Sequence, residues 1–129
     1  TKAFQQVMSA FRLPKETENE KKQRQDKIQE AMIYAAEVPL KTAQTALKVL
    51  ELAQIAAEKG NPNAASDAGV ATLLAWAAVE GAALNVKTNL GFIKDKSALR
   101  NLRMAINDAT AAAKVLMEDT MDSVHLALG

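Results

Sequence analysis

Residues 60–89 read GNPNAASDAGVATLLAWAAVEGAALNVKTN, and this stretch does most to decide the fold. It opens as a polar loop broken by Gly60 and Pro62, then becomes a long segment rich in alanine. Loops of this kind often carry function. Small residues such as Gly69 and Ala75 let neighbouring backbones approach closely, so we expect this segment to form a central helix.

The polar residues at either end of this segment predict where the helix begins and ends. Ser66 and Asp67 are both good N-cap residues, so the helix is predicted to begin at one of them. It runs to about Asn89, and Gly91 closes it. Gly60 is predicted to end the preceding helix in the left-handed conformation that glycine adopts readily.

Further helices are predicted on both sides of this one. Apolar residues spaced three and four apart indicate helical segments over residues 1–11, 17–38, 40–59 and 97–126. Thr17 and Glu20 form a capping box at the start of the second segment, and Pro39 is predicted to end or kink it. The last segment carries a heptad seam suited to antiparallel packing. The predicted fold class is therefore all-α, an up-and-down bundle of about five helices in a single helical domain, residues 1–129.

The composition limits which partners and which chemistry are expected. The net charge is +1, which gives no reason to expect binding to nucleic acid or to an anionic membrane. The absence of cysteine excludes disulfides and thiolate chemistry and fits a cytoplasmic protein. The apolar run Ala68–Val79 is too short to cross a membrane, so no membrane partner is expected. Aromatic residues make up only 4% of the chain, and such a thin core suggests a helical bundle whose core a second chain completes.

No general enzyme motif is present in the sequence, including phosphate loops and zinc-protease signatures. His125 is the single histidine, so a histidine-based triad or a metal site built from several histidines is excluded. We expect His125 to be solvated, because it lies near the end of the chain. The balanced charge run over residues 18–27 is expected to form a solvated helix face.

Two polar clusters remain as candidate substrate-binding residues: Asn61, Asn63, Ser66 and Asp67 in the first, Asn85 and Asn89 in the second. Helix capping would explain Ser66 and Asp67 alone, whereas a helix N-terminus with extra amide donors can also hold an anion. Asn85 and Asn89 lie one helical turn apart, which suggests either recognition or a buried polar network. The clusters are about 27 Å apart along one helix, so they can share only a long ligand or a site completed by a second subunit.

Several blocks together resemble the cyclodeaminase/cyclohydrolase family of folate enzymes. In order, these blocks are Ala10-Phe11-Arg12-Leu13-Pro14-Lys15, Ala36-Glu37-Val38-Pro39-Leu40, Gly60-Asn61-Pro62-Asn63 with Ser66-Asp67, and Ala83-Leu84-Asn85-Val86 with Asn89-Leu90. The resemblance implies an all-helical homodimer that acts on the one-carbon bridge between N5 and N10 of tetrahydrofolate, without a metal or redox cofactor. It favours hydrolysis of 5,10-methenyltetrahydrofolate to 10-formyltetrahydrofolate, with formiminotetrahydrofolate cyclodeaminase activity as the alternative.

The chain departs from the family pattern at its start. The resemblance places a catalytic aspartate three residues before the Ala3-Phe4 pair, just before Thr1, so the catalytic residue within this chain is unknown. The sequence therefore looks like the C-terminal two-thirds of the family domain, and its activity is expected to be impaired. A helical assembly module without catalysis and a binding-only folate protein are the competing hypotheses.

Overall fold

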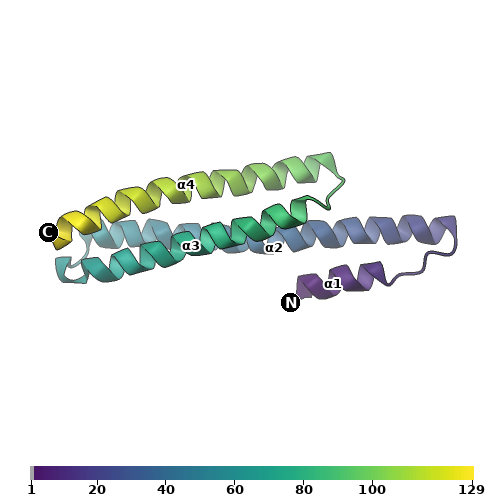
Figure 1. Ribbon diagram of the computed structural model, residues 1–129, viewed down its shortest axis with the longest axis horizontal. Helices are drawn as coiled ribbons and strands as arrows, with labels where there is room; N and C mark the ends of the chain where they lie inside the picture. Colours follow the sequence, from purple (N-terminus) through teal and green to yellow (C-terminus); the bar gives the residue numbers. More distant parts are fainter. Residues whose placement is uncertain (1) are drawn as a thin grey trace.

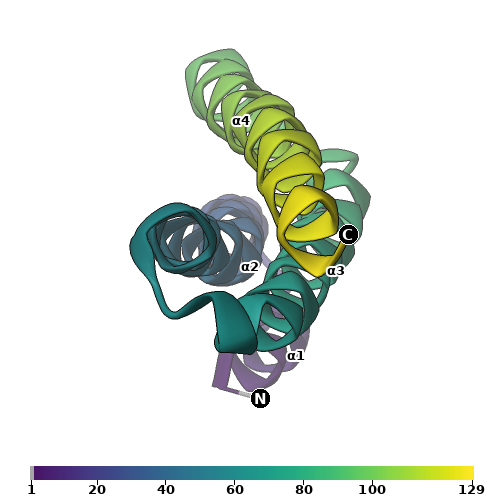
Figure 2. The same cartoon turned by 90° about the vertical axis from the view of Figure 1, so that its left-hand side faces the viewer.

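The computed structural model describes residues 2–129, and within them the chain folds into four α-helices and one short 3-10 turn. In order, the elements are α1 (Lys2–Phe11), α2 (Glu18–Lys59), η1 (Pro62–Ala64), α3 (Ala65–Leu90) and α4 (Lys96–Leu128). The three long helices lie side by side, and α1 packs beside the first half of α2 (Figure 1). Seen end-on, α2, α3 and α4 surround a common core, with α1 on the side of α2 and α3 away from α4 (Figure 2).

The prediction of about five helices is wrong at Pro39, because residues 17–38 and 40–59 belong to the single helix α2. Proline removes one backbone donor from a helix and crowds the carbonyl four residues earlier, here that of Ala35. The helix continues because a side chain of α3 supplies the missing donor, as described below. The capping box at the start of α2 is confirmed: Thr17 accepts from the Glu20 amide, and Glu20 accepts from the Thr17 amide.

The bundle core consists mainly of alanine and β-branched or leucine side chains, as the composition suggests. Its fully buried large residues are Leu50, Val79, Val86 and Ile106, joined by two threonines, Thr72 and Thr120. The buried Thr72 hydroxyl donates to the Ala68 carbonyl at 2.8 Å, so it carries no unpaired donor into the core. The predicted seam of the last helix is largely confirmed: Leu102, Ile106, Ala109, Ala113 and Thr120 are buried, and Leu99 and Leu116 are half-buried.

Two glycines allow close approach of the backbone in different ways. A Cβ atom at Gly69 would lie 3.1 Å from Val124 Cγ1, so this glycine lets α3 and α4 come together. Gly60 has an extended backbone, with φ −80° and ψ −172°, so the predicted left-handed end of the preceding helix is wrong. Glycine is needed there because a Cβ atom would collide with the Ala56 carbonyl oxygen.

The helix α3, together with η1, is long and apolar enough to cross a membrane. The segment Pro62–Leu90 has a mean hydropathy of 1.4 over its most apolar stretch. The prediction considered only the shorter run Ala68–Val79 and therefore underestimated the length of the apolar segment. However, α3 packs along both α2 and α4. The core helix of a soluble protein can be as long and as apolar as a helix that crosses a membrane. The absence of a membrane partner therefore stays a prediction.

Candidate functional site

The first predicted cluster lies at the N-terminal end of α3, and all four of its side chains are exposed. The Asn61 side chain accepts a hydrogen bond from the Asn63 amide at 3.0 Å and thereby caps η1. The chain is already helical at Ala65, so Ser66 and Asp67 lie in the first turn of α3 and neither is its N-cap. The N-cap position is Ala64, which makes no side-chain hydrogen bond. The predicted capping role of Ser66 and Asp67 is therefore wrong.

The second predicted cluster lines a cavity where α1, α2 and α3 meet. This cavity has a volume of about 540 Å³, and its lining residues are Ala3, Phe4, Val7, Met32, Ala35, Val38, Pro39, Asn85, Asn89 and Phe92. Asn85 is exposed and Asn89 is half-buried. The structure therefore brings Asn85 and Asn89 together at one site. It leaves Asn61, Asn63, Ser66 and Asp67 at the opposite end of α3.

Asn89 joins two helices at this cavity. Its Nδ2 donates to the Ala35 carbonyl of α2 at 3.0 Å and to the Asn85 carbonyl of α3, also at 3.0 Å. Ala35 lies four residues before Pro39, so its carbonyl lacks the amide donor that an ordinary helix would supply. The sequence left two roles open for the asparagines, recognition of a ligand or a buried polar network. Asn89 takes part in a polar network, and it also lines the cavity.

The side chain of Asn85 makes fewer hydrogen bonds within the fold than that of Asn89. Its Nδ2 donates to the Gly81 carbonyl of its own helix at 3.1 Å, which leaves the second amide proton and Oδ1 for other partners. Asn85 therefore offers both a donor and an acceptor at the surface of the cavity.

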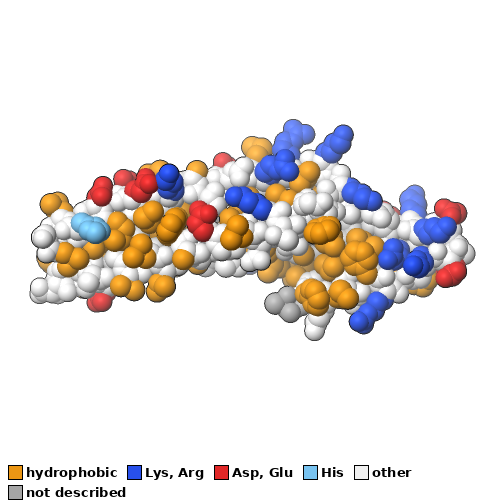
Figure 3. Space-filling view, in the orientation of Figure 1, with side chains coloured by type: hydrophobic (Ala, Val, Ile, Leu, Met, Phe, Trp, Pro, Cys, Tyr) orange, Lys and Arg blue, Asp and Glu red, His pale blue; other side chains and the backbone are white. Residues whose placement is uncertain are grey.

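Two phenylalanines also line the cavity, Phe4 near the start of α1 and Phe92 just after α3, and neither is among the six predicted site residues. Phe4 and Phe92 are 63% and 58% exposed, which is unusual for such large apolar side chains. The backbone at Phe92 is fixed by Gln29 of α2, whose side chain donates to the Phe92 carbonyl at 3.1 Å and accepts from the Lys94 amide at 2.7 Å. Phe4 belongs to the apolar face that predicts the first helix, and Phe92 lies in the turn that follows α3, so the sequence pattern marks neither as a site residue. Exposed apolar side chains gather beside the start of α1 (Figure 3).

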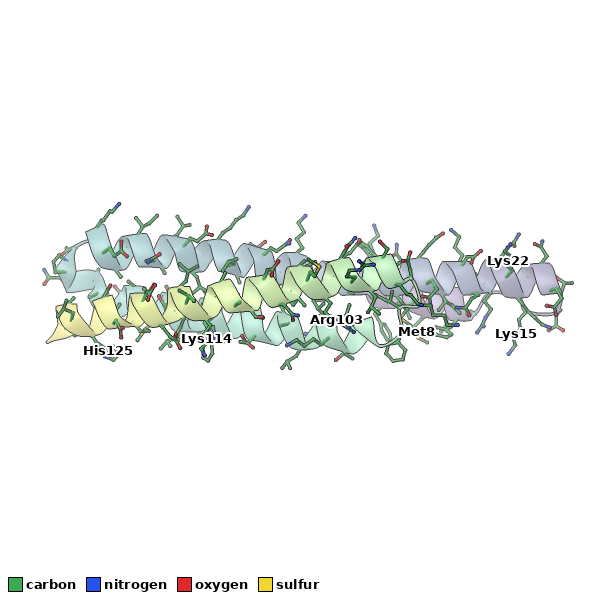
Figure 4. All side chains as sticks on the ribbon, turned by 90° about the horizontal axis from the view of Figure 1, so that it is seen from above. Met8, Lys15, Lys22, Arg103, Lys114 and His125 are labelled. Carbon is green, nitrogen blue, oxygen red and sulfur yellow. The ribbon has the colours of Figure 1, made fainter. Side chains whose placement is uncertain are left out.

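The electrostatics of the cavity are neutral. Among the described residues, those that line it include no Lys, Arg, Asp or Glu. Within residues 2–129, no group of three or more His, Asp or Glu side chains is close enough to hold a metal ion. His125 is exposed and lies near the far end of α4, well away from Met8 on α1 (Figure 4). The described lining therefore offers apolar side chains and two side-chain amides, but no charge.

Two other cavities of about 590 and 670 Å³ lie along α2. They are lined by α1 and α2, or by α2 alone, and neither contains any of the six predicted residues. The larger is an open depression on one helix face, lined by residues from Tyr34 to Val49. Three helices build the cavity that contains Asn85 and Asn89, and we take it as the candidate site.

The fold and the cavity define an all-α protein with a neutral site built by three helices. Residues 1–108 match the family model described as formiminotransferase-cyclodeaminase, and the chain belongs to this family. The fold is shared with the solved structure of formiminotetrahydrofolate cyclodeaminase from Thermotoga maritima, with a TM-score of 0.83 and 25% identity. That match covers 99% of this chain and 60% of the Thermotoga chain.

Curated relatives include enzymes of both reaction types. The chain is 43% identical over 122 residues to methenyltetrahydrofolate cyclohydrolase of Methylorubrum extorquens, covering 95% of this chain and 59% of that protein. It is 33% identical over 124 residues to formimidoyltransferase-cyclodeaminase of Sus scrofa, covering 96% of this chain and 23% of that protein. The family is therefore one of folate one-carbon enzymes, and the chain spans only part of the length of each relative.

Proposed function

We propose that this chain supplies the substrate-binding cavity of an enzyme that hydrolyses 5,10-methenyltetrahydrofolate to 10-formyltetrahydrofolate. The observation that carries the proposal is the neutral cavity with Asn85 and Asn89, in a chain of the folate family. The 43% identity to a methenyltetrahydrofolate cyclohydrolase supports this hydrolysis over the alternative, the cyclisation of 5-formiminotetrahydrofolate with loss of ammonia. Asn61, Asn63, Ser66 and Asp67 contact the substrate in this proposal only if it extends along α3, or if a second subunit brings them to another site.

The reaction needs a positioned water molecule and a group that moves protons. Water adds to the cationic methenyl carbon and loses a proton, which leaves a hydroxyl group on a tetrahedral carbon. That hydroxyl then gives up its proton as the C=O bond forms and the bond from the carbon to N5 breaks, and N5 takes up a proton. A carboxylate suits these transfers, because it stabilises the amidinium charge of the bridge and relays protons. We propose that no redox cofactor takes part, since no step changes an oxidation state, that no metal takes part, as the family resemblance implies, and that the enzyme is cytoplasmic.

The family resemblance places the catalytic aspartate just before Thr1. Ala3 and Phe4 follow that position, and both line the cavity, which supports a carboxylate reaching the reacting bridge from the start of α1. None of the described residues that line the cavity is acidic. We therefore propose that the 129-residue chain binds folate but turns over 5,10-methenyltetrahydrofolate poorly.

The alternative reaction is cyclisation of 5-formiminotetrahydrofolate with loss of ammonia. The Thermotoga cyclodeaminase, which matches over 99% of this chain, is the observation that favours it. Turnover of both substrates by the protein as its gene encodes it would separate the two. Faster use of the methenyl substrate is expected. Release of ammonia alone would overturn the hydrolase proposal, and folate binding without either turnover would favour the non-catalytic module.

We also propose that a second copy of the chain covers the outer face of α3 in a homodimer. The apolar residues exposed on this face are Val70, Leu73, Leu74 and Leu84. A contiguous exposed apolar face of this kind is a candidate interaction surface. Oligomeric state in solution tests this proposal, and the variant that does so is described in the Discussion.

A further inference from the structure

The side-chain amide of Asn89 has a single polar atom left to offer a ligand. An asparagine amide has two N–H donors and one carbonyl acceptor. Both donors of Asn89 are used, one on the Ala35 carbonyl and one on the Asn85 carbonyl. The opposite placement would bring Oδ1 against two carbonyl oxygens, so hydrogen bonding fixes which atom is the nitrogen. What Asn89 can present to the cavity is therefore the acceptor Oδ1.

The other lining groups narrow the chemistry of the ligand. Asn85 keeps one donor and one acceptor, because only one of its amide protons is used within α3. Phe4 and Phe92 add two largely exposed aromatic rings, against which a planar ring can stack or pack edge to face. The absence of Lys and Arg from the described lining disfavours a carboxylate, which would need a cation or several N–H donors.

We propose that this cavity takes the pteridine ring of the folate substrate, with Asn89 Oδ1 accepting from the N–H donors on the ring edge. The 2-amino group and N3–H of the ring are two adjacent donors, and the neighbouring 4-oxo group is an acceptor that Asn85 Nδ2 can meet. The aminobenzoyl-glutamate tail then lies outside the cavity. This inference rests on the proposed function, because it assumes that the substrate is a folate.

Competition calorimetry on the 129-residue chain tests the inference with three compounds. These are 5-formyltetrahydrofolate as a stable whole folate, 6-methyltetrahydropterin as the ring alone, and p-aminobenzoylglutamate as the tail alone. The ring compound is expected to displace the whole folate, and the tail compound is not. Displacement by the tail but not by the ring would overturn the inference and leave the proposed function standing. If the chain does not bind whole folate, the proposed function of this cavity fails as well.

Variants assign the binding to named side chains. Phe92→Leu keeps apolar volume but removes the ring, and about a three- to tenfold loss in affinity for the ring compound is expected. Asn89→Ala is expected to lose about tenfold or more, because a polar edge of the bound ring would be left without its acceptor. Asn107→Ala, at an exposed asparagine of α4, is the matched control, and its affinity should not change. Equal affinities in all three variants would overturn the inference.

The Phe92→Leu comparison also detects a different occupant of the cavity. Should Asn89→Ala fail to fold, Phe92→Leu and the competition series still decide the question. A chain that dimerises through Phe4 and Phe92, and so excludes the ring compound, would overturn the inference. Sedimentation of the chain and of Phe92→Leu would detect that outcome.

Discussion

Asn89 donates a hydrogen bond to the Ala35 carbonyl that Pro39 leaves without a helical donor. This contact joins residues 54 positions apart in the sequence and ties α3 to α2 beside the candidate site. It accounts for two features at once. The helix α2 continues through a proline, and an asparagine with low helix propensity is tolerated near the end of α3.

A double-mutant cycle tests this relationship. Asn89→Ala should lower the free energy of unfolding by about 1–3 kcal/mol, because the partly buried Ala35 carbonyl loses its partner. In a Pro39→Ala background the restored backbone amide can serve that carbonyl, so the same substitution should cost clearly less. Asn85→Ala is the matched control, since its side chain donates only within α3. Thermal unfolding followed by circular dichroism measures all the variants, and strictly additive effects of Pro39→Ala and Asn89→Ala would contradict the account.

The two helical glycines of α3 should respond in opposite directions to larger side chains. Gly69→Leu should destabilise the fold by about 1–3 kcal/mol, because a Cβ atom there already meets Val124 at 3.1 Å. Gly81→Ala should stabilise it by about 0.5–1 kcal/mol, because nothing lies within 4 Å of the added Cβ and alanine favours the helix. Denaturant unfolding gives both values. A neutral Gly69→Leu would show that α3 and α4 do not pack closely at this point.

The capping box gives the start of α2 a dependence on pH. Hydrogen bonds, first of all from the Thr17 backbone amide, lower the pKa of Glu20 from its usual 4.5. A carboxylate with a lowered folded-state pKa contributes its stabilisation above the unfolded value and loses it as the pH falls through the folded value. The first turn of α2 should therefore fray in acid below pH 4.5. Amide exchange at Thr17 and Glu20 measures this fraying. Glu20→Gln should remove this pH dependence, and an unchanged acid profile in that variant would rule out Glu20 as its source.

The outer face of α3 provides a direct test of self-association. Leu74 and Leu84 are 68% and 67% exposed, so replacing both with glutamate should cost the single chain little stability. If a second copy covers this face, the chain should sediment as a dimer and the double variant as a monomer. Leu126→Glu, at another exposed leucine near the end of α4, is the control and should remain dimeric. A monomeric parent chain would contradict the homodimer proposal.

Local signals predicted much of the fold. The capping box at Thr17 and the buried seam from Leu102 to Thr120 follow from spacings of three and four residues, which the helix itself dictates. Pro39 could not be interpreted in this way. The hydrogen bond that the proline removes is local to α2, but the replacement donor is Asn89 of α3. Because Asn89 is far away in the sequence, no pattern near Pro39 predicts this contact.

The candidate site was predicted in part. Asn85 and Asn89 were recognised because asparagine is a poor helix former, and both line the cavity. The amide of Asn61 beside a helix N-terminus also predicts a binding site, but this side chain caps a short turn at the other end of α3. Phe4 carries the spacing of a helix face and Phe92 lies in a turn, and neither signal predicts a site, because only the packing of α1 and α2 against α3 makes them neighbours of the asparagines.

The most direct test of the central claim is a nuclear magnetic resonance titration of the isotope-labelled chain with 5-formyltetrahydrofolate. The side-chain amide signals of Asn85 and Asn89 should shift as the folate is added, because both residues line the cavity. Those of Asn61 and Asn63 should stay in place. Shifts confined to Asn61 and Asn63, or no shift at any of the four, would contradict the account.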